Sequence, residues 1–417
     1  MRLAAALLCP SLTCSYGVHM TYCNALKLFS SASKSDSGSA DRLRMLLTRL
    51  DHPERSLSVI PVVGDKGKSS VVRMLSLMMA ASGIVVSAVT YPCLHTPKDN
   101  IFLNDKSLSN EAFVINAARL SEAIRAIKAT ENDITFTQNE LLFCLALCAG
   151  REIGARWMIL EIPSASFSPL SVVRFSFPLT VITSCGAEVG PSVTGMLRRG
   201  LTEAVSARLP FTSSYSAISG ACARAGCRLT VPVFSAINIL ESSLRRTVFT
   251  YRGIQYSIPL YGEYAISNAL CALESAAALR RLGCPITEDG ERTGLLFATI
   301  PARGEILSCS PTILVDAACD EFSEEALITL LSKKGTAIGG SITLCIESSA
   351  VPSPAFSRLS SLGFLLKEAV EVPVGKENSI ATRLIKNAAK DDLILAYGAL
   401  PFAFTMRTEF LKALRCM

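Results

Sequence analysis

Residues 59–70 read VIPVVGDKGKSS, and this stretch decides the fold of the N-terminal half. The segment 57–63, LSVIPVV, is rich in β-branched residues, which is typical of a parallel strand buried on both faces. A helical pattern follows over 71–83 and ends at Gly83, and IVVSAVT (84–90) predicts a second strand. Strand, turn, helix and strand in this order predict a βαβ unit.

The turn inside this unit carries residues suited to an anion. Gly64 and Gly67 let the backbone approach a phosphate group, Lys68 adds a positive charge, and a hydroxyl from Ser69 or Ser70 can coordinate Mg²⁺. The first amides of the following helix also favour an anion. The spacing G-x-x-G-K-S-S is shorter than G-x-x-x-x-G-K-[ST], so the alternative is that the glycines serve only the turn. The strand before and the helix after favour phosphate binding.

Length and composition restrict the class of protein. A chain of 417 residues predicts two or three domains, and half of the residues are hydrophobic. The net charge of +6 is spread without a Lys/Arg block, so we expect no nucleic-acid partner. Mean hydropathy is +0.38, yet apolar runs such as 141–150 are about half of the ~20 residues that a spanning helix needs. We therefore expect no membrane partner.

Histidine and cysteine usage restricts the chemistry further. The three histidines are His19, His52 and His95, so no imidazole is available beyond residue 95. Fifteen cysteines are scattered without a C-x-x-C pair, which favours buried free thiols in a reducing compartment over disulfides or metal sites. Residues 1–19 have the outline of a weak signal peptide, with an internal start at Met20 as the alternative.

The rest of the chain continues the α/β alternation. Helices are expected at 40–50, 110–129, 138–151, 197–209 and 266–283, and strands at 157–162, 179–186 and 229–236. An antiparallel hairpin is expected over 247–260. After a linker at 301–305, a new alternation begins with strands at 312–318, 341–347 and 391–398 and a helix from about residue 322. Two α/β domains are the simplest interpretation.

Several segments, in order, resemble motifs of the folylpolyglutamate synthase and dihydrofolate synthase family within the Mur ligase superfamily. The loop resembles G-T-N-G-K-G-S. TYPCLHTPKDNIFLNDKSLSNEAF (90–113) resembles the T-S-P-H-L and R-I-x-I-N-G segments, and TFTQNELLFCLAL (135–147) resembles T-F-F-E-x-L-T-A-L. MILEI (158–162) and LTVITSCG (179–186) look like two core strands. IPLYGEYAISNALCALESA (258–276), PARGE (301–305) and ILVDAACD (313–320) are similar to L-G-x-H-Q-x-x-N-A-x-x-A-L, P-G-R-L-E and L-L-D-G-A-H-N.

The resemblance implies a Mur ligase-like α/β fold. Residues 20–299 would form a P-loop-type ATPase domain with a mostly parallel sheet, and 300–417 a smaller Rossmann-like domain. Residues 1–19 would be an extension or a mis-assigned start. The family also implies a monomer, and the sequence after residue 20 is interpreted as cytoplasmic.

The activity implied is ATP-dependent amide ligation. ATP would phosphorylate the carboxylate of a folate-type acid, and the amine of L-glutamate would attack the acyl phosphate. The implied cofactors are ATP and Mg²⁺, and the catalytic residues are Lys68 and Glu140. Ser70, Glu140 and Glu188 would hold the metal. The ATP contacts would be Gly64, Asp65, Lys66, Gly67, Lys68, Ser69, Ser70, Asn268, Arg303 and Asp316.

Three of the acidic residues also have a simpler interpretation. Glu140 begins an apolar helix, where the helix dipole favours an acid anyway, and Glu161 at a strand end is interpreted as a solvated terminus. Asp316 follows a predicted strand, where open α/β sheets bind ligands, although it can also cap a helix.

The departures from the family are concentrated at catalytic positions. Asp65 and Lys66 stand where the family has Thr and Asn, and PSASFSPLSV (163–172) replaces a glycine-rich segment. A family histidine that binds metal aligns with Val189, beside Glu188, and a bridging lysine is missing where E-K-A-G aligns with 203–206. Tyr264, Ala265 and Cys319 replace the H-Q pair and the C-terminal histidine.

These departures leave two alternatives to a folate ligase. One is a degenerate ligase-fold protein that binds nucleotide without ligation. The other is a Mur-type ligase for another acid.

Overall fold

The structure is a computed structural model that describes residues 12–13, 19–33, 40–93, 96–131, 133–163, 177–197, 200–209, 211–243, 245–317, 321–332, 340–347, 359 and 365–416. The chain divides into two compact units, Met1–Pro232 with Asn268–Gly294, and Val233–Ser267 with Leu295–Met417. The segment Val233–Ser267 therefore groups with the C-terminal part of the chain, although it precedes the predicted boundary at 299.

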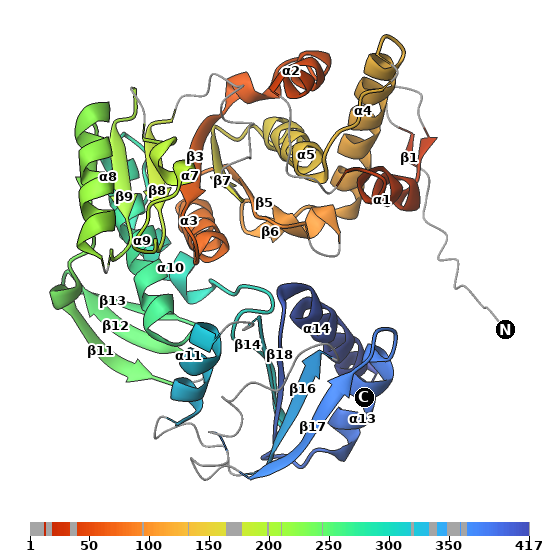
Figure 1. Cartoon of the computed structure of the whole chain (residues 1–417), viewed down its shortest axis with the longest axis vertical. Helices are drawn as coiled ribbons and strands as arrows, with labels where there is room; N and C mark the ends of the chain where they lie inside the picture. Colours follow the sequence, from red (N-terminus) through yellow and green to blue (C-terminus); the bar gives the residue numbers. More distant parts are fainter. Residues whose placement is uncertain are drawn as a thin grey trace. The chain divides into compact units, whose positions relative to one another are not determined.

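The first unit is built on an eight-stranded sheet with the order β10-β9-β8-β3-β7-β4-β5-β6 (Figure 1). The strands from β10 to β4 are parallel, and β5 and β6 add antiparallel pairs at one edge. The bounds are β3 Ser58–Val63, β4 Val86–Val89, β5 Ile101–Leu103, β6 Lys106–Ser107, β7 Trp157–Glu161, β8 Leu179–Ile182, β9 Glu203–Ser206 and β10 Arg228–Thr230. The predicted mostly parallel sheet is confirmed.

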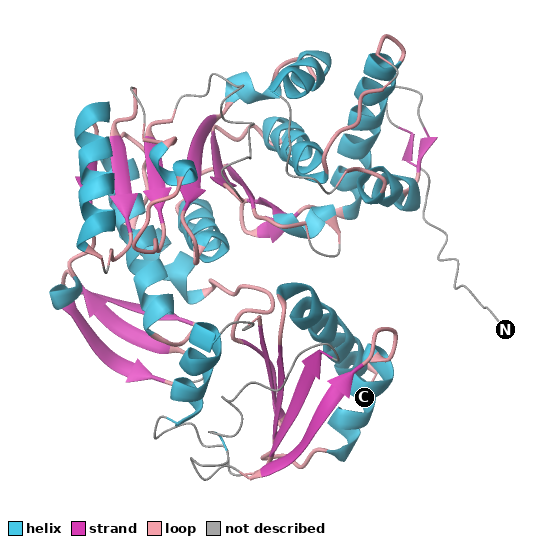
Figure 2. Cartoon of the chain, in the orientation of Figure 1, coloured by secondary structure: helices cyan, strands magenta, loops and turns pink. Residues whose placement is uncertain are grey.

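Helices flank this sheet (Figure 2). They are α1 Tyr22–Ser30, α2 Ala40–Arg49, α3 Lys68–Ala81, α4 Asn110–Lys128, α5 Gln138–Glu152, α7 Pro191–Thr194 and α8 Thr212–Ala225, with short 3-10 turns η1 Pro53–Ser56 and η2 Pro97–Asn100. A small pair, β1 Leu12–Thr13 and β2 His19–Met20, precedes them. Helix α5 begins with a full capping box, and its side chains 140–150 are buried, so a nearly all-apolar helix forms part of the core.

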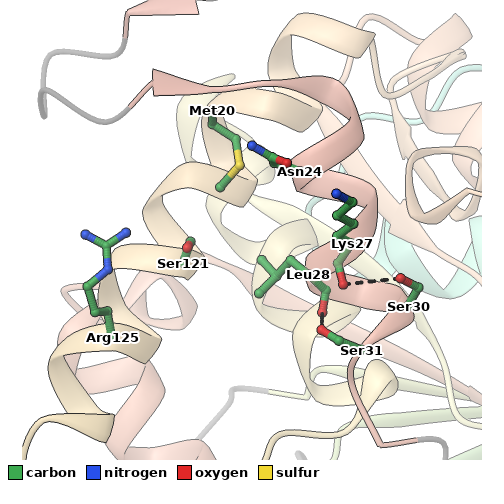
Figure 3. A pocket seen from close by; sticks show the side chains of 8 residues that line it. All are labelled: Met20, Asn24, Lys27, Leu28, Ser30, Ser31, Ser121 and Arg125. Carbon is green, nitrogen blue, oxygen red and sulfur yellow. Dashed lines mark hydrogen bonds between the residues drawn. The ribbon is translucent and has the colours of Figure 1, made fainter.

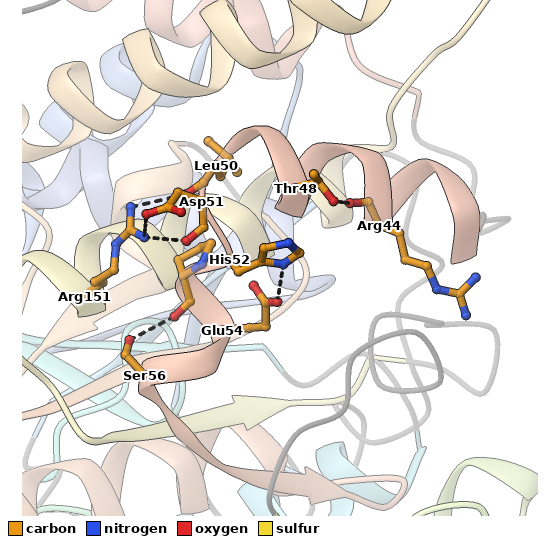
Figure 4. Close-up of polar contacts among 9 residues, drawn as sticks. Arg44, Thr48, Leu50, Asp51, His52, Glu54, Ser56 and Arg151 are labelled. Atoms are coloured by element: carbon orange, nitrogen blue, oxygen red, sulfur yellow. Dashed lines mark hydrogen bonds and ion pairs between the residues drawn. The ribbon is translucent and has the colours of Figure 1, made fainter.

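The turn from α2 into β3 fixes where the central strand begins (Figure 4). Asp51 and His52 both have left-handed backbone, with φ of 59° and 48°. Arg151 at the end of α5 donates to the carbonyl oxygens of Asp51 at 2.9 Å and Leu50 at 3.2 Å. The His52 Nδ1 lies 2.9 Å from the Glu54 Oε1. These contacts offset the cost of two consecutive strained residues.

The second unit contains two sheets. A three-stranded antiparallel sheet is formed by β11 Ile237–Ser242, β12 Thr247–Tyr251 and β13 Ile254–Ile258. The five-stranded sheet has the order β14-β15-β18-β16-β17, with only β14 antiparallel. Its strands are β14 Glu305–Cys309, β15 Thr312–Asp316, β16 Ile342–Glu347, β17 Leu366–Val372 and β18 Leu393–Tyr397, and its helices are α11 Glu321–Ser332, α13 Glu377–Asn387 and α14 Leu400–Arg415. A buried aliphatic cluster from β15, β16, β18 and α11 forms its core.

Two further helices contribute residues to both units, α9 Glu263–Arg281 and α10 Glu288–Leu296. The 3-10 turn η3 Phe234–Ala236 precedes β11. The predicted hairpin over 247–260 is confirmed as β12 and β13, with the turn at Arg252 and Gly253. Across the described residues, none of the helices is both long and apolar enough to cross a bilayer.

Two secondary-structure predictions were wrong. The helix expected over 197–209 contains the strand β9, which pairs in parallel with β8 and β10 and is buried along its length. A short apolar run is ambiguous between helix and strand, and here two strand partners decide. The strand expected over 229–236 ends at Thr230, because Pro232 cannot donate to a ladder, and η3 follows.

Candidate nucleotide site

The glycine loop joins β3 to α3, and its glycines are required by the geometry. Gly64 has φ of +126°, and a Cβ there would lie 2.4 Å from the Thr183 Oγ1. Gly67 is the N-cap of α3 with φ of +89°, and a Cβ would lie 2.3 Å from the Asn268 Oδ1. Both positions therefore exclude any larger residue, through backbone conformation and through space.

Asn268 therefore lies against the loop. Both Gly67 and Asn268 were predicted to contact ATP. It lies on α9, is 8% exposed, and presents its amide group to Gly67 at the N-terminus of α3. A buried amide at a helix N-terminus lies where an anion would be held by backbone N–H groups.

Lys68 closes the loop on itself. Its ammonium group donates to the carbonyl oxygens of Gly64 at 2.8 Å and of Asp65 at 3.1 Å. Both carbonyls belong to the loop, so the charge is held next to the first turn of α3. A lysine in this place can exchange these carbonyls for phosphate oxygens.

Asp65 is anchored by the neighbouring strand connection. Its amide donates to the Ser184 carbonyl at 2.8 Å, and its Oδ2 accepts from the Gly186 amide at 2.8 Å. Lys66 forms an isolated bridge with Ser184, whose hydroxyl donates to the Lys66 carbonyl at 3.2 Å. The two residues that depart from the family loop are therefore fixed against the segment after β8.

A buried acid that contacts the start of α3 is Glu161, at the end of β7, next to β3 in the sheet. The Ser69 hydroxyl donates to the Glu161 Oε2 at 2.8 Å, and the Tyr91 amide donates to the same oxygen at 3.1 Å. Glu161 is 3% exposed. The sequence interpretation of Glu161 as a solvated terminus was wrong, because the parallel pairing of β3 with β7 brings its carboxylate to the loop.

Glu140 lies in a different environment, with its carboxylate in a structural network. Its Oε2 accepts from the Thr137 amide at 2.8 Å, which completes the capping box of α5. Arg42 donates to both carboxylate oxygens, the shortest contact being 3.0 Å from Nη2 to Oε1. Glu140 is 2% exposed, and these contacts stabilise its buried negative charge without requiring a metal. Its predicted metal and catalytic roles stay predictions.

Ser70 and Glu188, the other predicted metal ligands, are not joined to Glu140 by any contact that the structure records among the described residues. Ser70 lies partly buried in the first turn of α3, and Glu188 is exposed after β8. The described residues contain no cluster of three or more His, Cys, Asp or Glu side chains that could hold a metal. A metal at the loop would therefore draw on a hydroxyl, one carboxylate and the oxygens of a bound ligand, a set that suits Mg²⁺.

Arg303 and Asp316 belong to the second unit. Asp316 ends β15 and is 9% exposed, and the Tyr261 hydroxyl donates to its Oδ2 at 3.0 Å. Burial raises the pKa of the Asp316 carboxyl to about 6, although the Tyr261 hydroxyl and the Arg303 charge oppose this. Arg303 is exposed in the turn before β14. Tyr261 lies in the segment 258–276 that resembles a family motif, but it was not among the predicted site residues.

A surface hollow of about 710 Å³ lies between α1 and α4, lined by residues other than those predicted for the site (Figure 3). Its lining comes from Met20, Asn24, Lys27, Leu28, Ser30, Ser31, Ser121 and Arg125. The hydroxyls of Ser30 and Ser31 donate to helix carbonyls, so they are already used within α1.

Several positions from the family comparison lie outside the described residues. They are His95, Cys319 and residues 164–172, which belong to the stretch 163–172 that replaces the family's glycine-rich segment. The E-K-A-G motif had been aligned with 203–206, which is the buried strand β9.

Comparison with known proteins gives relatives of one kind. The chain is 24% identical over 324 residues to a dihydrofolate synthase/folylpolyglutamate synthase of Mycobacterium tuberculosis, a match covering 70% of this chain and 66% of that protein. It is 23% identical over 314 residues to a folylpolyglutamate synthase of Lacticaseibacillus casei, covering 71% of this chain and 73% of that protein. The match thus spans just under two thirds of the mycobacterial relative. No protein-family model matches the chain.

Solved structures have the same architecture. The folylpolyglutamate synthetase of Lactobacillus casei superposes with a TM-score of 0.77 at 20% identity, covering 95% of this chain and all of that one. A folylpolyglutamate synthase of Mycobacterium tuberculosis complexed with ADP superposes with a TM-score of 0.71 at 19% identity, covering 93% and 99%. A folylpolyglutamate synthase–AMPPCP–folate complex gives a TM-score of 0.77 at 21% identity, covering 94% and 100%.

The two α/β units and the glycine loop define the Mur ligase-like class of fold, as predicted. Within that class, the chain is similar to folylpolyglutamate synthases and dihydrofolate synthases, at 20–24% identity.

Proposed function

We propose that this protein is an ATP-dependent ligase that adds L-glutamate to a folate-type acid. The observation that carries the proposal is the contact between Ser69 and Glu161 at 2.8 Å, which places a buried carboxylate beside a strand–loop–helix junction. Relatives that carry this activity in their names support the substrate class.

The loop residues are proposed to hold the phosphates of ATP. Backbone amides at the start of α3 would bind phosphate oxygens, and Lys68 would move from the Gly64 carbonyl to the transferred phosphoryl group. Asn268 would contact the nucleotide next to Gly67, and Arg303 and Asp316 stay proposed nucleotide contacts. Gly64, Asp65, Lys66, Ser69 and Ser70 complete the proposed loop contacts.

The chemical steps follow from this arrangement. The substrate carboxylate attacks the terminal phosphorus of ATP, releasing ADP and forming an acyl phosphate. The amine of L-glutamate then attacks the acyl carbon, and the phosphate leaves as the amide forms. The protein contributes positioning and positive charge at the phosphoryl group, which are the main requirements of phosphoryl transfer.

Mg²⁺ fits the proposed site through oxygen ligands. Ser69 and Glu161 are the residues we propose to hold it, since both present oxygen atoms at the loop. When bound, Mg²⁺ neutralises charge on the phosphate oxygens. The alternative is that Ser70, Glu140 and Glu188, the ligands implied by the family resemblance, hold the metal.

A cytoplasmic monomer is also proposed. Of the twelve described cysteines, none is in a disulfide and Cys144, Cys148, Cys185, Cys222, Cys271, Cys284 and Cys345 are buried, which supports a reducing compartment.

A second candidate is a nucleotide-binding protein without ligation. The ion pair of Glu140 with Arg42 favours it, because this pairing engages an acid that was predicted to bind metal.

Incorporation of labelled L-glutamate separates the candidates. We expect the purified protein to attach label to folate in an ATP-dependent reaction. Label transferred to another acid but not to folate would identify a different ligase. ATP bound without any transfer would support the second candidate and contradict ours.

A further inference from the structure

The carboxylate of Asp316 is enclosed by its own unit. It lies at the end of β15, and besides the Tyr261 hydroxyl it accepts a hydrogen bond from the Gly304 backbone amide. The turn that supplies this amide is tied to β15, because the Ala317 amide donates to the Ala302 carbonyl at 2.9 Å. The carboxylate is therefore held by a side chain and by a backbone turn.

The Tyr261 ring is fixed in place by the same turn. Gly304 has φ of +60°, and a Cβ there would lie 2.8 Å from the Tyr261 Cε1. Tyr264 packs edge-on against Tyr261, with ring centroids 6.4 Å apart and an interplanar angle of 75°. Tyr261 is 1% exposed, so its hydroxyl has little freedom to turn away from Asp316.

We propose that Tyr261 is a positioning residue that orients the Asp316 carboxylate and keeps it ionised for nucleotide binding. The nucleotide part rests on the proposed function. A hydroxyl donor stabilises the charged form of a buried carboxylate, which desolvation otherwise disfavours. The charged groups acting on Asp316 include Arg303, which also favours the ionised form.

The proposal extends the site because it gives a role to Tyr261, which was not among the predicted site residues. An ionised Asp316 accepts hydrogen bonds from a ligand, whereas the protonated acid gives up part of that capacity. Nucleotide affinity should then fall as the carboxyl is protonated, with a midpoint set partly by Tyr261.

The test uses Tyr261→Phe, which removes the hydroxyl and keeps the ring. The Asp316 carboxyl is followed by carbon-13 NMR between about pH 4 and pH 8, with Asp316→Asn to identify its signal. We expect the midpoint to rise from about 6 by roughly one pH unit. In parallel, the dissociation constant of a non-hydrolysable ATP analogue is measured over the same range.

In Tyr261→Phe, the pH below which the affinity for the analogue falls should rise together with the midpoint of the Asp316 carboxyl. Tyr256→Phe removes another buried phenol of the same unit and should leave both midpoints in place. An unchanged Asp316 midpoint in Tyr261→Phe would overturn the proposal, as would a shifted midpoint without a shift in analogue affinity. If the wild type binds the analogue but transfers no glutamate, the proposed function is wrong. The role of Tyr261 is then still decided by whether Tyr261→Phe shifts the Asp316 midpoint and the pH dependence of analogue binding.

Discussion

The Ser69 hydroxyl donates a 2.8 Å hydrogen bond to the Glu161 carboxylate, so the first turn of α3 is joined to the end of β7. The two residues are far apart in the sequence and meet because β3 and β7 are parallel neighbours. This contact places a buried acid at the candidate phosphate site.

Glu161→Gln should abolish most of the turnover. The amide keeps an acceptor for Ser69 but removes the negative charge proposed for the metal, so we expect kcat to fall by about 100-fold or more. The measurement is ADP release over a range of Mg²⁺ concentrations. Glu188→Gln is the comparison, since Glu188 is the exposed alternative ligand. A larger loss with Glu188→Gln than with Glu161→Gln would contradict our choice of ligand.

Gly67→Ala should weaken ATP binding by about tenfold or more. The added Cβ would lie 2.3 Å from the Asn268 Oδ1 at a left-handed position, so the loop or α9 must shift. Calorimetric titration with an ATP analogue measures the loss. Gly83→Ala is the matched control, because its φ is +76° but nothing lies within 4 Å of the new Cβ. Equal analogue affinities in the two variants would show that close packing at Gly67 is unimportant.

Glu140→Gln distinguishes a cap from a metal ligand. Glutamine at N3 can still complete a capping box, but the charge on Arg42 loses its partner. We expect the free energy of unfolding to fall by about 1–3 kcal/mol, with kcat/KM of the folded protein retained. Denaturant unfolding is compared with Glu111→Gln, an exposed acid in the first turn of α4. Loss of kcat/KM at unchanged stability would instead support the predicted metal role.

Asp316 gives the stability of the protein a pH dependence of its own. Its folded-state pKa of about 6 lies above the ordinary value of 3.8, so the folded protein binds the extra proton between these values. The stability contribution is fully present below about pH 4 and is lost as pH rises through 6. The difference of about two pH units corresponds to roughly 3 kcal/mol.

Asp316→Asn should remove this slope. Relative to the wild type, the variant should gain stability on going from about pH 4 to pH 7, by an amount on the order of 3 kcal/mol. Urea unfolding at both pH values measures the gain. A difference between the two proteins that does not vary with pH would show that Asp316 titrates normally.

Much of the fold could be predicted because its signals are local. The run before Gly64, the helix that ends before Gly83 and the strand at β7 all have clear periodicity and boundaries. β9 was missed because a four-residue strand owes its conformation to its neighbours β8 and β10, which no local pattern reveals.

The site was less predictable because its contacts cross the sheet. Gly67 and Asn268 were both proposed from motifs, and the structure brings them together. Glu161 was dismissed since its role depends on which strands are neighbours. Tyr261 lies within the segment 258–276 but was not predicted as a site residue, and only its packing against Gly304 and its hydrogen bond to Asp316 identify it.

The most direct test is ADP release by the purified protein with folate and L-glutamate, compared with Lys68→Ala. Our account predicts that ADP release requires both substrates and is abolished in Lys68→Ala, because the loop then lacks its charge at the phosphoryl group. ATP binding by the wild type without ADP release, over folates and a panel of other acids, would contradict it.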